Sequence, residues 1–227
     1  TYAYTVSLSI DGGDPGTASS PATVTVDRSA PAVPAAPAAA SPTRVAPSLA
    51  WSAVAGAARY VVVRDGARLA TTTALALTDA AAADGSRAYA VIAVDAVGNE
   101  SAASAAATVV VDTVPPAAPT GLAAARADTS AAPELAWAPV ADAASYRVYR
   151  GATLIGQPTA ATYVDAPLPA DGGYAYRVAA VDAAGNEGAR SAAVAVAVDT
   201  VAPEAPVPAA ASRLTASAPV LTWPAIA

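Results

Sequence analysis

Tryptophan recurs along this chain at a fixed interval. Trp51, Trp137 and Trp223 are separated by 86 and 86 residues, and Tyr60 and Tyr146 keep the same interval. Unlike residues that share one period indicate tandem modules of about that length, because a chance repeat would not align them together. The chain is therefore expected to be an array of like domains rather than one domain of 227 residues.

A Val-Asp pair followed by prolines marks the module boundaries. The acidic residue of this pair falls at Asp27, Asp112 and Asp199, at spacings of 85 and 87 residues. The predicted segments are the last two strands of one module in 1–27, complete modules in 28–112 and 113–199, and the linker and first strands of a further module in 200–227. We expect the sequence to be a segment of a longer array.

Apolar and polar side chains alternate with a period of two within each module, which is typical of half-buried strands. Tyr174, Tyr176, Val178 and Ala180 show this alternation, and so do Leu49 with Trp51 and Val194 with Val196 and Val198. Turn residues recur every 8–12 positions, the spacing expected of a β-sandwich. These patterns predict an all-β fold with tandem sandwiches of about seven strands each.

Three residue pairs predict the tight turns. Asp65-Gly66 indicates a type I′ hairpin, and Gly151-Ala152 suits a type II′ turn. Gly185-Asn186 is expected to form the two-residue loop between the strand that contains Tyr174 to Ala180 and the returning strand with Val194, Val196 and Val198.

Alanine supports a competing prediction, because it is the best helix former and a poor strand former. Residues 80–83 and 101–107 are helical on propensity alone. The period-two alternation and the frequent Pro and Gly outweigh that propensity, so strands are expected.

Composition excludes several function classes. The net charge is -6, and all 12 basic residues are Arg, which argues against nucleic acid as a partner. The absence of Cys and His removes disulfides, thiolate chemistry and the usual general base. No run of ~20 apolar residues predicts a membrane span, and no signal peptide is recognised. The proline-rich linkers favour extended, semi-rigid polyproline II segments.

The modules resemble bacterial fibronectin type III domains. The resemblance lies in the early-strand tryptophans, in Tyr60 and Tyr146, and in the stretch 168–188. It implies an immunoglobulin-like sandwich with a tyrosine corner, for which Leu168 and Tyr174 match. In the other complete module Ala81 and Arg87 occupy these places, so its corner is in doubt.

A repeated Asp-x-x-Gly-Asn-Glu pattern gives the one metal hypothesis. Calcium prefers six to eight oxygen ligands, and a module junction could collect them. The two predicted sets are Asp27 with Asp95 and Glu100, and Asp112 with Asp182 and Glu187. The structural alternative is that each aspartate closes an Asx-turn beside Asn99 or Asn186. No other cofactor is predicted.

Other candidate residues have simpler structural interpretations. Paired carboxylates at Asp79/Asp84 and Asp165/Asp171 match a glycosidase pair in type, but we interpret them as solvated turn residues. The tryptophans are expected in the core, and Tyr60, Tyr146, Tyr149 and Tyr163 in the core or on a sheet face. Asn99-Glu100-Ser101 matches a glycosylation sequon by chance. The arginines expected on outward strand faces are Arg59, Arg64, Arg68, Arg87, Arg147, Arg150 and Arg177.

We predict no enzymatic activity for this segment. The favoured role is a non-catalytic spacer or stalk of a bacterial extracellular or cell-surface protein, such as an adhesin or surface filament, with neighbouring modules as partners. One alternative is modules that bind polysaccharide or self-associate through edge strands and alanine-rich faces. The other is an accessory region of a secreted hydrolase.

Overall fold

The computed structural model describes residues 1–7, 17–167 and 169–205. The chain divides into two compact units, Thr1–Val114 and Pro115–Ala227. All regular elements of the described residues are strands, which confirms the all-β prediction. Within those residues no helix is long and apolar enough to cross a membrane.

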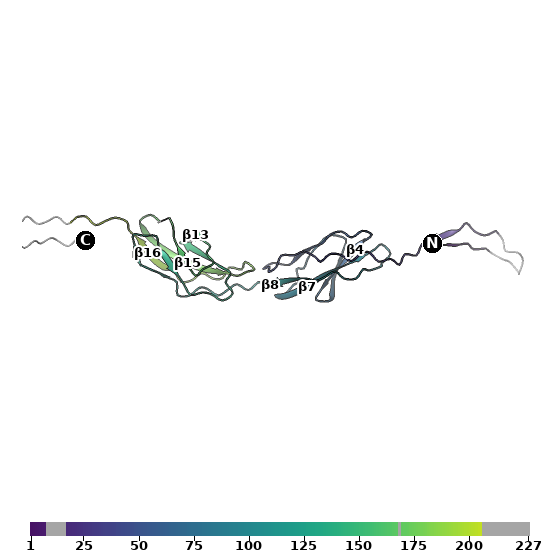
Figure 1. Cartoon of the computed structure of the whole chain (residues 1–227), viewed down its shortest axis with the longest axis horizontal. Helices are drawn as coiled ribbons and strands as arrows, with labels where there is room; N and C mark the ends of the chain where they lie inside the picture. The colour runs from purple at the N-terminus through teal and green to yellow at the C-terminus, as the bar shows by residue number, and fades with distance from the viewer. Residues whose placement is uncertain (8–16, 168, 206–227) are drawn as a thin grey trace, which may run out of the picture. The chain divides into compact units, whose positions relative to one another are not determined.

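The sandwich of unit 1 is built from a four-stranded and a two-stranded sheet, and Figure 1 labels β4, β7 and β8 of the larger one. The larger sheet has the order β5-β4-β7-β8, with every neighbour antiparallel, and the smaller sheet pairs β3 with β6. The strands are β3 (Ser48–Ala50), β4 (Arg59–Arg64), β5 (Ala67–Thr72), β6 (Ala76–Thr78), β7 (Gly85–Val94) and β8 (Ala107–Val111).

Unit 2 repeats this plan with a five-stranded and a three-stranded sheet. Their orders are β10-β16-β15-β12-β13 and β14-β11-β9, and Figure 1 labels β13, β15 and β16 of the larger sheet. The strands are β9 (Ala123–Ala124), β10 (Asp128–Thr129), β11 (Glu134–Ala136), β12 (Ser145–Arg150), β13 (Thr153–Gly156), β14 (Thr162–Val164), β15 (Gly172–Val181) and β16 (Val194–Val198).

The first strand of each sandwich is shared between its two sheets. In unit 2, β9 pairs antiparallel with β11 and β10 pairs parallel with β16. In unit 1 the same exchange is reduced to two bridges, Ala38 to Ala50 and Thr43 to Val111. Pro42, which lies between the two bridges, lacks the amide donor that a continuous ladder needs. If the exchanging segment counts as one strand, each sandwich has the seven strands predicted.

A tryptophan–tyrosine pair occupies each core. Trp51 is 7% exposed and packs edge-on against Tyr60, with ring centroids 5.7 Å apart. Trp137 and Tyr146 repeat the contact at 5.2 Å. The tyrosine hydroxyl accepts a hydrogen bond from the backbone N–H of the chain entering its strand, from Val54 at 2.8 Å in unit 1. The predicted core position of the tryptophans is confirmed for these two, and Trp223 lies outside the described residues.

The tight hairpins form where the turn residues predict them. Asp65 and Gly66 have φ values of 52° and 82°, as a type I′ turn requires. Gly151 has a φ of 62° at the first central position of the β12–β13 turn, consistent with type II′.

The prediction of a two-residue loop at Gly185-Asn186 is wrong. The strand ladder closes at a bridge between Val181 and Glu187, so the loop runs through 182–186, and β16 resumes only at Val194. Asp182 holds this wider loop: its Oδ1 accepts the N–H of Asn186 at 2.8 Å. Only the glycine of the pair adopts a positive φ, which is 89°.

Neither segment that alanine made a candidate for helix is helical, and serine side chains hold the second of them, residues 101–107. Ser101 Oγ accepts the N–H of Ala93, and Ser104 Oγ accepts the N–H of Val91, both at 3.0 Å. Each serine N–H also donates to the carbonyl of the same partner at 2.9 Å. These bonds continue the ladder beside β7 where residues 101–106 form no regular strand.

The N-terminal residues form a separate hairpin. β1 (Tyr2–Tyr4) and β2 (Ala22–Val24) pair antiparallel, with Tyr2 opposite Val24. The division into 1–27, 28–112, 113–199 and 200–227 stays a prediction.

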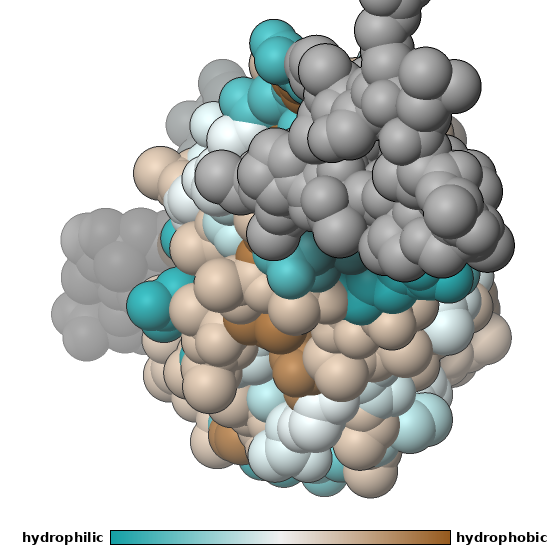
Figure 2. All heavy atoms as spheres, turned by 90° about the vertical axis from the view of Figure 1, so that its left-hand side faces the viewer, coloured by the Kyte–Doolittle hydropathy of each residue, from teal (hydrophilic) through white to brown (hydrophobic). Residues whose placement is uncertain are grey.

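The face in Figure 2 shows mostly pale, weakly hydrophobic residues with small brown areas, as expected when alanine supplies much of a 55% hydrophobic composition.

The two cores are expected to unfold independently. Leu135 is 2% exposed in unit 2, so Leu135→Ala should destabilise that unit by about 2 to 5 kcal/mol through lost burial and a cavity. Urea titration followed by amide NMR signals would resolve the two units. The exposed Leu154→Ala is the control, and an equal shift of both units would contradict independent cores.

Candidate functional sites

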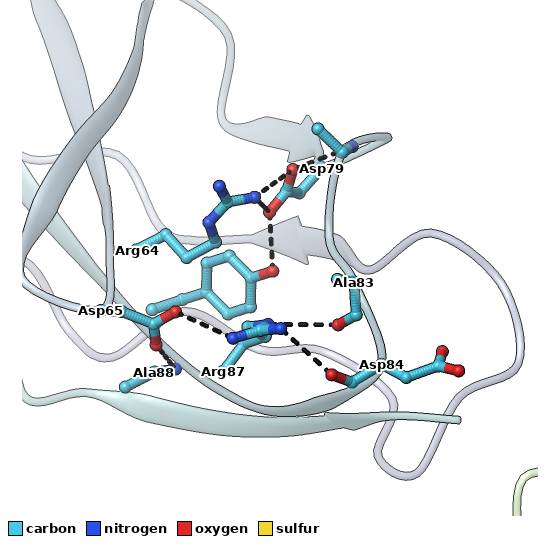
Figure 3. Close-up of polar contacts among 9 residues, drawn as sticks. Arg64, Asp65, Asp79, Ala83, Asp84, Arg87 and Ala88 are labelled. Carbon is cyan, nitrogen blue, oxygen red and sulfur yellow. Dashed lines mark hydrogen bonds and ion pairs between the residues drawn. The ribbon is translucent and has the colours of Figure 1, made fainter. Parts of the chain in front are cut away.

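A buried carboxylate ties three strands of unit 1 together (Figure 3). Asp79, just after β6, is 3% exposed. Its Oδ2 accepts the hydroxyl of Tyr89 on β7 at 2.8 Å, and both of its oxygens accept Arg64 Nη1 of β4, at 2.8 and 3.1 Å. Because Tyr89 is fully buried, the network lies at the edge of the core.

Unit 2 contains the same network at equivalent positions. Asp165 is 4% exposed, and its Oδ2 accepts the Tyr176 hydroxyl and Arg150 Nη1, both at 2.7 Å. The guanidinium of Arg150 also lies 5.4 Å from the ring centroid of Tyr174. Repetition of the triad in both units assigns it to the shared fold.

Electrostatic interactions keep the Asp79 carboxylate of the unit 1 triad ionised. Burial pushes the pKa of Asp79 upward, but hydrogen bonds from Arg64 and Tyr89 outweigh burial and leave that pKa below its ordinary value. Burial, with the bond to Asp79, raises the pKa of Tyr89 to about 12. The tyrosine is therefore a neutral donor to an ionised carboxylate at physiological pH.

These contacts correct the interpretation of Asp79 and Asp165 as solvated turn residues. The sequence does not reveal the burial of these two aspartates. They follow β6 and β14, which have three residues each, and a strand that short shows too little alternation to indicate which face the next residue lies on. The arginine partners are also not outward-facing residues: the Arg64 side chain is 29% exposed and bends to Asp79. Spacing carried the missed signal, because each arginine precedes its aspartate by 15 residues in both units.

The other member of each carboxylate pair binds the start of the outgoing linker. Asp84 accepts the Thr113 hydroxyl at 2.9 and 3.0 Å and the Thr113 N–H at 3.2 Å. Asp171 accepts the Thr200 hydroxyl at 2.8 Å and its N–H at 3.0 Å. We call these contacts the linker clasps. With Asp79 and Asp165 engaged in the triads, both carboxylate pairs have structural roles.

The predicted calcium ligands of unit 1 have other hydrogen-bond partners. Asp95 Oδ1 accepts the backbone N–H groups of Val97, Gly98 and Asn99 at 2.7–3.0 Å, and its Oδ2 accepts Asn99 Nδ2 at 2.7 Å. Burial raises the pKa of Asp95, but these bonds outweigh it and hold the pKa below normal. The aspartate therefore closes an Asx-turn.

The rest of that set is engaged as well. Asp27 Oδ1 accepts the N–H of Ser29 at 2.9 Å, and Glu100 forms an ion pair with Arg68. Within either unit of the described residues, no group of three His, Cys, Asp or Glu side chains could hold a metal ion. Asp182 repeats the turn with Asn186. Because Asp112 belongs to unit 1 and Asp182 and Glu187 belong to unit 2, calcium at this second set stays a prediction.

Glutamates after the turns bind the outer face of the larger sheet. Glu187 forms an ion pair with Arg147 and accepts the hydroxyl of Tyr149. Arg190 stacks over the Tyr149 ring at 3.5 Å, which leaves that tyrosine 6% exposed. This cluster covers the sheet with local partners, as expected for cross-strand pairing.

The tyrosine corner has an arginine substitute in unit 1. In unit 2 the Tyr174 hydroxyl donates to the Ala170 carbonyl at 2.8 Å, and Leu168 lies outside the described residues. At the matching position Arg87 donates from Nε to the Ala83 carbonyl, also four residues upstream, at 3.1 Å (Figure 3). The doubt over this corner is resolved, because the arginine makes the same connection.

The sequon lies in the Asx-turn rather than on a free loop. Asn99 Nδ2 donates to Asp95 and to the Asp27 carbonyl, and Ser101 is 9% exposed. These contacts agree with a chance match.

No protein-family model matches the sequence. The chain is 37% identical over 208 residues to exoglucanase B of Cellulomonas fimi, a match that covers 82% of this chain and 19% of that enzyme. It is 39% identical over 153 residues to chitinase A1 of Niallia circulans, covering 61% of this chain and 22% of the chitinase. It is 47% identical over 70 residues to a poly(3-hydroxybutyrate) depolymerase of Ralstonia pickettii, covering 31% and 14%.

The fold matches solved fibronectin type III arrays. The FN1–FN3 domains of chicken CNTN1 superimpose with a TM-score of 0.53 at 17% identity, covering 84% of this chain and 74% of theirs. Both described sandwiches therefore have the fibronectin type III fold, and the resemblance drawn from the sequence is confirmed.

The buried triad of unit 1 predicts a specific acid response. Tyr89→Phe removes one donor to Asp79 and should destabilise unit 1 by about 1.5 to 3 kcal/mol at neutral pH. A depressed pKa contributes stability above the unfolded-state value near 4, and that stability is lost as pH falls through the folded pKa. The variant raises the folded pKa, so acid unfolding should begin at higher pH.

Urea unfolding of unit 1, followed by its amide NMR signals at neutral pH and below the unfolded-state pKa of aspartate, measures this response. The cost of Tyr89→Phe should shrink in acid, where Asp79 is protonated with or without the tyrosine hydroxyl. The control is Tyr60→Phe, whose hydroxyl accepts a backbone N–H and whose cost should be the same at both pH values. An equal cost of Tyr89→Phe at both pH values would contradict the assigned role.

If Arg87 takes the place of the corner tyrosine in unit 1, a tyrosine at this position should make the same bond to the Ala83 carbonyl. Arg87→Tyr should retain the stability of unit 1, whereas Arg87→Ala should lose about 1 kcal/mol by removing the bonds to the Ala83 and Asp84 carbonyls. Urea unfolding compares the two variants. If alanine and tyrosine gave the same midpoint, the arginine would not act as a corner.

Proposed function

We propose that this array of fibronectin type III domains is a non-catalytic spacer region of a secreted bacterial enzyme that degrades a polymer. Of the roles considered from the sequence, the relatives favour the accessory region of a hydrolase over an adhesin or surface filament.

The chemistry of the relatives carries this proposal. By their names, the relatives that match parts of this chain are an exoglucanase, a chitinase and a poly(3-hydroxybutyrate) depolymerase, and the matches cover 82%, 61% and 31% of it. The first two substrates are joined by glycosidic bonds and the third by ester bonds, so one shared active site cannot serve all three. The region also covers 22% or less of each enzyme, which leaves most of each chain for catalysis.

The side chains of the described residues support the same role. The carboxylates that resemble catalytic pairs in type serve the triads and clasps, where their oxygens accept protein donors. A general acid or base must instead reach a proton on the substrate. An extracellular location fits, because a solid polymer is too large to enter a cell.

Excision from the full-length protein tests the proposal. Removal of residues 28–199 should leave kcat on a short soluble substrate unchanged and reduce the release of product from solid polymer, because a spacer sets reach and not chemistry. The control replaces 28–199 with an unrelated spacer of matched length, which should restore activity on the solid. Loss of activity on the soluble substrate would contradict a non-catalytic role.

Sedimentation of the 227-residue chain with cellulose, chitin or poly(3-hydroxybutyrate) separates this role from its competitor. A spacer should stay in the supernatant and remain monomeric at high concentration. Saturable binding to one polymer would instead assign a binding role, and concentration-dependent dimers would favour self-association.

A further inference from the structure

The linker between the two sandwiches is anchored at both ends by contacts within each unit. On the unit 1 side, Asp84 accepts the hydroxyl and the N–H of Thr113. On the unit 2 side, Pro116 lies so close to Gly188 that a Cβ there would collide with the Pro116 carbonyl oxygen. Only Val114 and Pro115 lie between these anchors.

The two intervening residues have little torsional freedom. Proline fixes φ at Pro115 and Pro116, and a residue that precedes proline is confined to extended conformations. That restriction applies to Val114 and to Pro115 itself. The N–H of Val114 also donates to Asp112 Oδ1 at 3.0 Å, which restrains the torsion just after Thr113.

We propose that the segment from Thr113 to Pro116 is a stiff joint, and that the Asp84 clasp is the contact that makes it stiff. Prolines alone stiffen the linker, but they do not restrict rotation about the backbone torsions of Thr113, where the linker leaves unit 1. The clasp removes that freedom by tying the first linker residue to the loop before β7. The biological purpose of the joint rests on the proposed spacer role, whereas its stiffness is a property of the chain itself.

Unit 2 provides a matched clasp that acts on a different linker. Asp171 binds Thr200 through the same pair of donors, and Val201 donates to Asp199 at 2.9 Å as Val114 does to Asp112. Loss of this second clasp alters the segment that leaves unit 2 and leaves the joint at 113–116 intact. It therefore controls for removal of an exposed loop carboxylate.

Residual dipolar couplings of the weakly aligned, 227-residue chain test the proposal. A stiff joint gives the amides of both sandwiches the same degree of alignment, and a loose joint gives each its own. We expect equal alignment in the unaltered chain and in Asp171→Ala, and unequal alignment in Asp84→Ala. Thr113→Val, which removes only the hydroxyl donor, should give a smaller difference.

Core amide shifts matching the unaltered chain would show that each variant still folds. Unequal alignment in the unaltered chain would overturn the stiff joint. Equal alignment in both Asp84→Ala and Thr113→Val would overturn the role of the clasp, and loss of equality only in Pro115→Ala would assign the stiffness to proline. A failed excision experiment would refute the spacer role without changing these couplings.

Discussion

The packing of one indole between two small sheets organises each sandwich. Trp51 and Trp137 come from the smaller sheet side, and each meets a tyrosine of the larger sheet edge-on. Such a pair contributes about 0.5 to 1.5 kcal/mol beyond the area it buries. In a chain without Phe or Met and with 5% aromatic residues, few other side chains are large enough to hold two sheets together.

Because the core has so few large residues, the loops are held in position mainly by polar side chains. Alanine buries little area, so loops rich in alanine gain little from packing. In the described residues their positions depend on oxygens that accept backbone N–H groups: Asp95 and Asp182 in the turns, and Ser101 and Ser191 beside the strands. Each such bond satisfies a donor that would otherwise be lost from the ladder.

The difference between core residues, whose positions follow from strand alternation, and loop residues, whose positions depend on hydrogen bonds, explains which features the sequence could predict. Trp51 and Leu49 repeat with period two, so their burial follows from strand geometry alone. Asp65-Gly66 needs only local backbone preferences, and its turn was predicted. The burial of Asp79 depends on where β4 and β7 bring Arg64 and Tyr89. That placement is a tertiary property, and only the repeated spacing of 15 residues could have indicated it.

The same reasoning separates the two aspartates that looked like catalytic partners. Asp79 acts inward, where burial makes its bonds to Arg64 and Tyr89 strong. Asp84 acts outward, where solvent weakens each bond but two donors of Thr113 converge on one carboxylate. An exposed bond contributes little to folding stability, yet it can still restrict a linker, because a linker has few other contacts. A clasp of this kind is therefore better suited to controlling the freedom between domains than to stabilising either domain.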